Sequence, residues 1–137
     1  MTEEKKRIRW IPLLVGMLIA EIVPILIVFA LVALFGPPDE AASADYALRV
    51  RRMVATIGGT AMAFIVAAKI GRKSSTPVHQ GLMLGAGLVI LDALLILLGQ
   101  VPFEWLFLLS SVLKLLGGGF GGALAAANTR YEGRTRA

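Results

Sequence analysis

Charged side chains are rare inside apolar segments, and this chain has three of them: Glu21, Asp92 and Lys114. Each is the single charge in the interior of its own long apolar stretch. If such a stretch crosses a membrane, one charge near its middle costs about 2.5–3.5 kcal/mol, so these residues usually pair or carry a function. Two acids and a lysine at similar depth can fix helix register as an ion pair, or pass a proton or small cation. We take these residues as the candidate functional site.

Other chemistry is largely excluded by what the chain lacks. Its sequence of 137 residues has no cysteine and one histidine, His79. A disulfide framework, a cysteine-ligated zinc, an iron–sulfur cluster and a bis-histidine haem are therefore ruled out, and we predict neither a metal site nor a cofactor. Ser110 and Lys114 have the i,i+4 spacing of a Ser–Lys pair, but this spacing alone is weak, and we predict that the protein is not an enzyme.

The elements that must position these charges are four apolar segments, at about 10–35, 50–70, 78–98 and 102–127. The chain is 57% apolar and 17% charged, with a mean hydropathy of +0.78, and is more apolar than an average soluble domain. Each segment is close to the ~20 residues that cross a bilayer, where the backbone must be helical. The sequence therefore predicts an all-α integral membrane protein, an antiparallel four-transmembrane-helix bundle that forms one domain over residues 1–137.

The connections between the segments carry further signals. Residues 36–45 begin with the turn sequence Gly-Pro-Pro, and we expect them to continue as a short helix that runs into the second segment. Asp45 and Arg49 have the i,i+4 spacing of a helical ion pair. Residues 71–77 form a polar connector. The sequence Gly-Gln-Val-Pro at 99–102 predicts a tight turn between the last two segments.

The distribution of basic residues predicts the orientation of the chain. Ten of the 14 lie before the first segment, between the second and third, or after the fourth, whereas the opposite side has Arg49, Arg51 and Arg52. The positive-inside rule then places both termini in the cytoplasm, in an inner (plasma) membrane of bacterial type. We expect the three outer arginines to reach lipid headgroups or to pair with Asp45 and Glu104, with an anion or headgroup site as the alternative.

Small residues mark the faces on which the helices are expected to meet. In lipid, helices gain little from hydrophobic association, so close backbone approach supplies van der Waals packing instead. The residues expected at such contacts are Gly59, Ala63, Gly81, Gly85, Gly117, Gly118, Gly121 and Gly122. The fourth segment has more glycine than one contact needs, which favours close crossings on two faces or a break. Packing within the bundle, packing on a second copy or another protein, and a backbone-lined ion site are all open at this point.

Two of the three charges lie on the helix faces that small residues mark. Lys114 lies on the glycine face of its segment, and Asp92 stands seven residues after Gly85, so both are expected to point at a neighbouring helix. Glu21 lies near Pro24, which removes a backbone hydrogen bond and is expected to kink the first helix. All three charges can meet if they face inward. Because two of them lie on adjacent helices, we predict an Asp92–Lys114 pair with Glu21 as the odd carboxyl.

A lone acid in the stretch Ala20-Glu21-Ile22-Val23, within a short chain of four helices, resembles the small multidrug resistance transporters. The resemblance covers these few residues of the first segment. It implies that Glu21 exchanges a proton or a cation. The sequence departs from that family in its buried Lys–Asp system and its longer loops, so no other residue is carried over.

These features predict a non-catalytic membrane module that packs through its glycine faces and self-associates or joins a membrane complex. Its partners would be the lipid bilayer and a second copy of the chain or another membrane protein. The alternative is a small proton- or cation-coupled transporter that uses Glu21, Asp92 and Lys114. Nucleic acid is not an expected partner, because the basic residues form short clusters beside the apolar segments. His79 is expected to be an ordinary exposed side chain.

Overall fold

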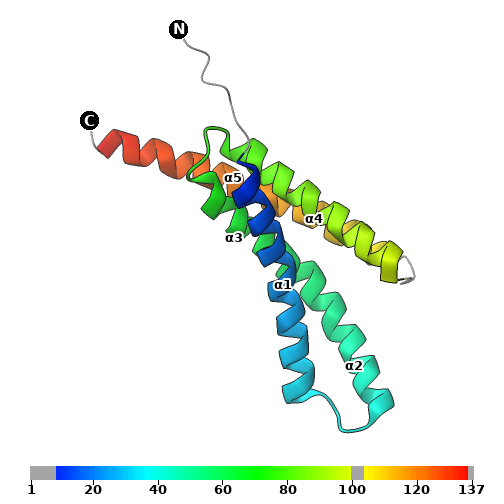
Figure 1. The fold of residues 1–137 in the computed structure, drawn as a ribbon. Helices are drawn as coiled ribbons and strands as arrows, with labels where there is room; N and C mark the ends of the chain where they lie inside the picture. The colour runs from blue at the N-terminus through cyan, green and yellow to red at the C-terminus, as the bar shows by residue number, and fades with distance from the viewer. Residues whose placement is uncertain (1–8, 100–103, 136–137) are drawn as a thin grey trace.

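The computed structural model describes residues 9–99 and 104–135, and within these ranges the protein is all-helical (Figure 1). The elements in chain order are α1 (Trp10–Phe35), α2 (Glu40–Met53), the π-helical turn η1 (Val54–Gly58), α3 (Gly59–Gly71), α4 (Pro77–Gly99) and α5 (Trp105–Thr135). Because α2, η1 and α3 follow one another without a break, the described residues form four long helical segments. All four are long and apolar enough to span a membrane.

The predicted segments match these helices, with differences at their ends. The second helix begins at Glu40, because the Asp39 carboxylate accepts a hydrogen bond from the Ala42 amide at 2.9 Å and caps it. The two prolines of the preceding turn, Pro37 and Pro38, therefore lie before the cap. The last helix begins at Trp105 and continues to Thr135, beyond the predicted 102–127. Apart from Gly99, which ends α4, the turn predicted at 99–102 lies outside the described residues.

The packed core lies at the end of the molecule where α1 begins and α3 ends. Three helices supply its buried apolar side chains, which are Leu13 and Ala20 of α1, Ala63, Val66 and Ala67 of α3, and Leu84 and Leu88 of α4. Farther along the same helices the side chains are open, with Leu34 74% and Leu97 75% exposed. Burial of large apolar residues therefore stops about half-way along α1 and α4.

Close packing at this end depends on α5 glycines that touch two neighbouring helices. A methyl group on Gly118 would collide with the Gly81 carbonyl of α4, and one on Gly81 would collide with the Gly118 carbonyl. On another face of α5, a methyl group on Gly117 would lie 2.8 Å from the Thr60 carbonyl oxygen of α3. The helix itself is unbroken. The glycine-rich stretch therefore makes close crossings on two faces, as one of the two sequence-based alternatives expected.

The small residues expected at helix contacts are used within a single chain. All eight are buried, namely Gly59, Ala63, Gly81, Gly85, Gly117, Gly118, Gly121 and Gly122. Their neighbours come from α3, α4 and α5 of the same molecule. The sequence left open whether these residues pack within the bundle or on a second protein. In the structure they pack within one chain. A second copy would have to use other surfaces.

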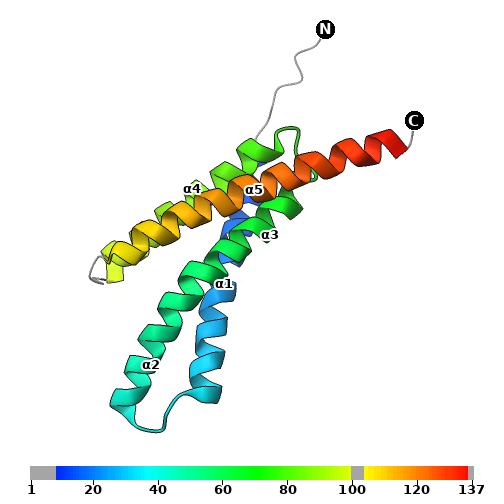
Figure 2. The same ribbon diagram turned by 180° about the vertical axis from the view of Figure 1, so that it is seen from behind.

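Away from this core, the helices separate into two arms. Figures 1 and 2 show the end of α1 with α2 in one arm, and the end of α4 with the start of α5 in the other. The arms diverge from the region of α3, so the antiparallel four-helix bundle that the sequence predicts is not confirmed along the whole length of the helices.

We predict that alanine at Gly81 or Gly118 destabilises the protein, whereas alanine at Gly119 does not. The first two substitutions press a methyl group onto a backbone carbonyl, and overpacking of this kind typically costs about 1–3 kcal/mol. A methyl group at Gly119 would meet only the flexible end of Leu82, at 3.2 Å. Thermal unfolding of the detergent-purified variants measures the difference. Equal unfolding midpoints for Gly118→Ala and Gly119→Ala would contradict this packing.

Candidate functional site

Lys114 is the buried centre of the candidate site. It lies about a third of the way along α5, on the same face as the buried Ser110 and Gly118, and only 3% of its surface is exposed. Its aliphatic stem reaches across to α3, where a methyl group on Gly59 would come within 2.7 Å of Lys114 Cε. The absence of a side chain at Gly59 therefore leaves the space that the lysine occupies.

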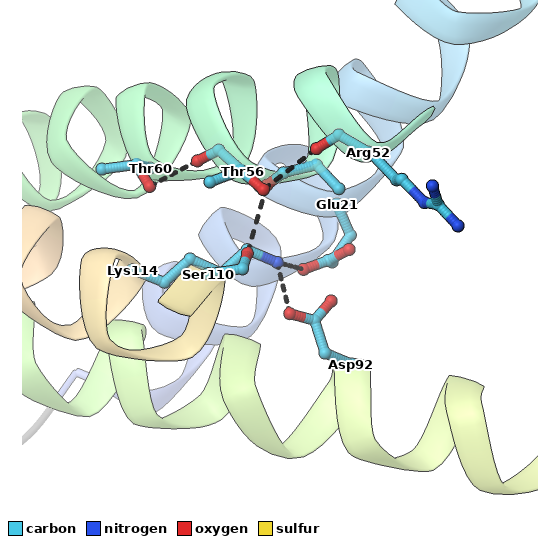
Figure 3. A network of polar contacts seen from close by, with 8 residues as sticks. Glu21, Arg52, Thr56, Thr60, Asp92, Ser110 and Lys114 are labelled. Carbon is cyan, nitrogen blue, oxygen red and sulfur yellow. Dashed lines mark hydrogen bonds and ion pairs between the residues drawn. The ribbon is translucent and has the colours of Figure 1, made fainter. Parts of the chain in front are cut away.

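Two carboxylates from different helices share the Lys114 ammonium group (Figure 3). Its Nζ donates to Asp92 Oδ2 of α4 at 2.6 Å and to Glu21 Oε1 of α1 at 3.0 Å. The predicted Asp92–Lys114 pair is present. The expectation that Glu21 would be left over is wrong, because α1 brings its carboxylate to the same nitrogen. One ammonium group thus links α1, α4 and α5.

The three side chains of this cluster are largely withdrawn from solvent. The exposed fraction of the side chain is 4% for Lys114, 15% for Glu21 and 18% for Asp92. With both acids ionised, the cluster has one negative charge in excess, and burying an uncompensated charge is unfavourable. One bound proton or one small cation would neutralise it. The arrangement is therefore suited to hold and release a single positive charge.

A cavity of about 240 Å³ leads from this cluster into the space between the two arms. Every long helix contributes to its wall, and most of the lining side chains are apolar, including Pro24, Ile25, Val28, Leu48, Leu95, Ile96 and Leu106. The charged cluster forms its buried end. The more exposed residues Arg51, Arg52 and Glu104 lie at its other end. The cluster is therefore open to small solutes from the side on which the arms diverge.

At the exposed end, an ion pair joins the two arms. Arg52 Nη2 of α2 donates to Glu104 Oε1, just before α5, at 2.6 Å. Arg49 pairs with Asp45 along α2 at 3.3 Å. The expected pairing of outer arginines with these two acids is thus confirmed. Arg51 lines the cavity and has no ion-pair partner among the residues that the structure describes.

On the side away from the cavity mouth, the packed core and hydrogen bonds at the start of α1 cover the cluster. Gln80 of α4 is 1% exposed, and its Nε2 donates to the Arg9 carbonyl at 3.0 Å. Arg9 Nη1 donates to the Lys73 carbonyl at 3.2 Å, which ties α1 to the connection between α3 and α4. Sequence reasoning missed Gln80, although a polar residue beside Gly81 on a packing face was a signal for it. The described residues thus leave the cluster accessible from one end.

A π-helical turn, η1 (Val54–Gly58), lies beside the cluster and lines the cavity. The Ser110 hydroxyl of α5 donates to the Ala55 carbonyl of this turn at 3.4 Å, while the Thr56 and Thr60 hydroxyls donate to carbonyls of their own helix. Such turns are rare and often occur at functional sites. Sequence reasoning missed it, because Val-Ala-Thr-Ile-Gly has no feature that separates a π turn from an α-helix.

The remaining sequence-based candidates have other roles. Pro24 is buried and lines the cavity, and α1 continues past it as one helix to Phe35. The hydroxyl of Ser110, which was considered beside Lys114 as a catalytic pair, is directed to a backbone carbonyl. His79 is exposed at the start of α4 and does not line the cavity.

Comparisons with protein-family models, with curated proteins and with solved structures find no match to this chain. The likeness of Ala20-Glu21-Ile22-Val23 to the small multidrug resistance transporters therefore stays an interpretation of four residues. The cluster and its cavity are the features of the described residues that bear on function.

We predict that the three charges stabilise the fold as a unit. Replacing Lys114 with methionine leaves two neighbouring carboxylates without their cation, and breaking a buried ion pair in this way costs about 3–5 kcal/mol. Adding Glu21→Gln and Asp92→Asn removes both stranded charges, so the triple variant should regain most of the lost stability. Chemical denaturation in mild detergent gives the free energies of unfolding.

The exposed pair at the cavity mouth provides the matched control for this cycle. Arg52 and Glu104 are 50% and 40% exposed, so neutralising either one should change stability by less than about 1 kcal/mol. The single variants Glu21→Gln and Asp92→Asn complete the cycle. If the losses of unfolding free energy of the three single variants simply add, so that the triple variant is the least stable of all, the cluster does not act as a unit.

Proposed function

We propose that the protein is a small multi-pass protein of a bacterial-type inner membrane, with four antiparallel spanning helices and both termini in the cytoplasm. Four helices have the necessary length and hydropathy, and only 11–39% of the residues in their most apolar windows are buried. So much exposed apolar surface calls for a lipid environment. The bias of the basic residues supports the orientation. In this orientation the cavity opens to the outside and the core lies toward the cytoplasm.

Within that setting, the function that the geometry supports best is proton- or cation-coupled transport through Glu21, Asp92 and Lys114. One observation carries this proposal: a cavity ends on a buried cluster that has one negative charge in excess. An ion pair that only sets helix register needs neither a second carboxylate nor access from solvent. Ionisable residues with both properties are typical of ion pathways and proton relays in membranes.

The cluster also connects the occupancy of the site to the position of α1. The Glu21–Lys114 contact holds α1 against α5, and the Asp92–Lys114 contact holds α4 there. A proton or cation that neutralises one carboxylate weakens its attraction to the ammonium group. The corresponding helix is then held less firmly, so uptake of the charge can change how the arms are spaced.

The alternative function is a non-catalytic membrane module that self-associates or joins another membrane protein. The observation in its favour is the divergence of the two arms (Figure 2), along which apolar side chains such as Leu34 and Leu97 stay exposed and offer a surface to a partner helix. The glycine faces no longer support it, because they are buried within one chain. We place it second for that reason.

We predict one-sided access to the cavity, which single-cysteine variants can measure because the chain has no cysteine of its own. Thr56→Cys lines the cavity and should react with a membrane-impermeant thiol reagent from the outside. Ser75→Cys, in the connection between α3 and α4, should react only from the cytoplasmic side. Ala63→Cys, at a position with 0% exposure, should react from neither. The reverse labelling pattern would contradict the orientation, and an unreactive Thr56→Cys would contradict access.

We also predict that Glu21→Gln abolishes ion flux. In proteoliposomes with an imposed gradient, the wild-type protein should move protons or a small cation, and the variant should fall to the level of protein-free vesicles. Asp45→Asn is the matched control, because it removes an acid that is 70% exposed and outside the cavity lining. Equal flux for Glu21→Gln and wild type, or no wild-type flux of H⁺, Na⁺ or K⁺, would contradict the transport proposal.

A further inference from the structure

The charges that line the cavity are sorted by sign along its depth. At the buried end, two carboxylates face one ammonium group, so this end has one negative charge in excess. At the exposed end, Arg51 and Arg52 stand with a single acid, Glu104, so this end has one positive charge in excess. Apolar side chains from both arms line the space between. The cavity is therefore neutral as a whole and dipolar along its length.

The groups that provide the two excess charges are available to a ligand. The Arg52 guanidinium is paired with Glu104 at 2.6 Å, whereas the Arg51 side chain has no hydrogen bond or ion pair with any residue that the structure describes. At the buried end, the Glu21 and Asp92 side chains line the cavity and keep 15% and 18% of their surface exposed. A free cationic group at one end therefore faces accessible carboxylates at the other.

The spacing of these ends sets the length of the ligand. Arg51 and Gly59, against which the Lys114 stem lies, are eight residues apart along one continuous helix. At 1.5 Å per residue, their levels differ by about 12 Å, and the long side chain of Arg51 can shorten this gap. The volume of about 240 Å³ is below the ~300–1,000 Å³ of pockets for drug-sized molecules. The ligand that fits is small and elongated.

We propose that the cavity binds a small zwitterion, with its ammonium group against Glu21 and Asp92, its anionic group against Arg51, and an aliphatic chain between them. The ammonium group supplies the positive charge that the cluster lacks, and the anionic group accepts hydrogen bonds from the guanidinium. The apolar walls match the chain between the two groups. This inference rests on the proposed transport function, because the ammonium group is then the cation that the cluster takes up.

Two sources offer this chemistry. A free ω-amino acid can enter from the water outside. The headgroup of a zwitterionic lipid can enter between the arms, with its acyl chains left in the bilayer. Both present an ammonium and an anionic group. The lipid headgroup has only two carbons between them, so a free ω-amino acid of longer chain fits the spacing of the two ends better, and the experiment below separates the two sources.

The test compares three probes of equal chain length, 6-aminohexanoate, n-hexylamine and hexanoate, by calorimetric titration of the detergent-purified full chain. We expect 6-aminohexanoate to bind roughly tenfold or more tightly than n-hexylamine, because it alone reaches both charged ends. Hexanoate should bind weakest of the three, since it leaves the excess negative charge at the buried end of the cavity without a partner. Equal affinity for 6-aminohexanoate and n-hexylamine, or no binding of either, overturns the proposal.

Variants on one helix identify the anion contact. Arg51→Gln should lower the affinity for 6-aminohexanoate to that for n-hexylamine and leave n-hexylamine itself unchanged. Arg49→Gln is the control, because Arg49 lies on the same helix, is 74% exposed and does not line the cavity. If Arg51→Gln and Arg49→Gln bind 6-aminohexanoate alike, the assignment of Arg51 is wrong.

The two proposals fail in different ways. If n-hexylamine binds as well as the zwitterion and Glu21→Gln removes both binding and flux, the transport function stands and the zwitterion is excluded. If the zwitterion binds through Arg51 but no flux of any ion is found, the cavity is a binding site without transport. Phosphatidylethanolamine added to the micelles then identifies the source. Competition with 6-aminohexanoate assigns the site to a lipid headgroup, and no competition assigns it to a free solute.

Discussion

A single buried ammonium group shared by two carboxylates is the interaction on which the rest of this structure depends. Lys114 is 3% exposed, and a cation so deeply buried is tolerated only when its charge is compensated by close partners. Glu21 and Asp92 provide that compensation at 3.0 and 2.6 Å. They come from α1 and α4, so the need to compensate one lysine of α5 brings three helices together at one depth. Gly59 of α3 completes the arrangement, because it leaves room for the lysine stem.

The glycines of α5 explain why this meeting point has a cavity on one side and a core on the other. On the core side, Gly117 and Gly118 allow α3 and α4 to approach α5 to backbone contact. On the other side the helices diverge into two arms (Figure 1). The cluster sits where close packing gives way to divergence. A buried charge and access from solvent, which usually exclude one another, are combined at this place.

Much of this could be predicted from the sequence, because apolar length and helical periodicity determine depth and face. The first helix was predicted with its observed bounds, and the inward position of Asp92 and Lys114 followed from the glycines beside them. The role of Glu21 was misjudged, since depth and face do not reveal which helices cross at a given point. Whether a glycine face packs within one chain or between two is likewise not encoded in its spacing. The divergence of the arms and the π turn of η1 are tertiary features without a local sequence signal.

The central claim is that Lys114 Nζ contacts the carboxylates of both Glu21 and Asp92. Dipolar-recoupling solid-state NMR in lipid bilayers measures these nitrogen–carbon contacts most directly. The protein would be labelled with ¹⁵N at lysine Nζ and with ¹³C at the carboxyl groups of glutamate and aspartate. We predict that Lys114 Nζ couples to the carboxyl carbons of both Glu21 and Asp92, that Glu21→Gln removes only the first coupling, and that Asp92→Asn removes only the second. Coupling of Lys114 to one acid alone, or to neither, would contradict the shared ion pair and the account built on it.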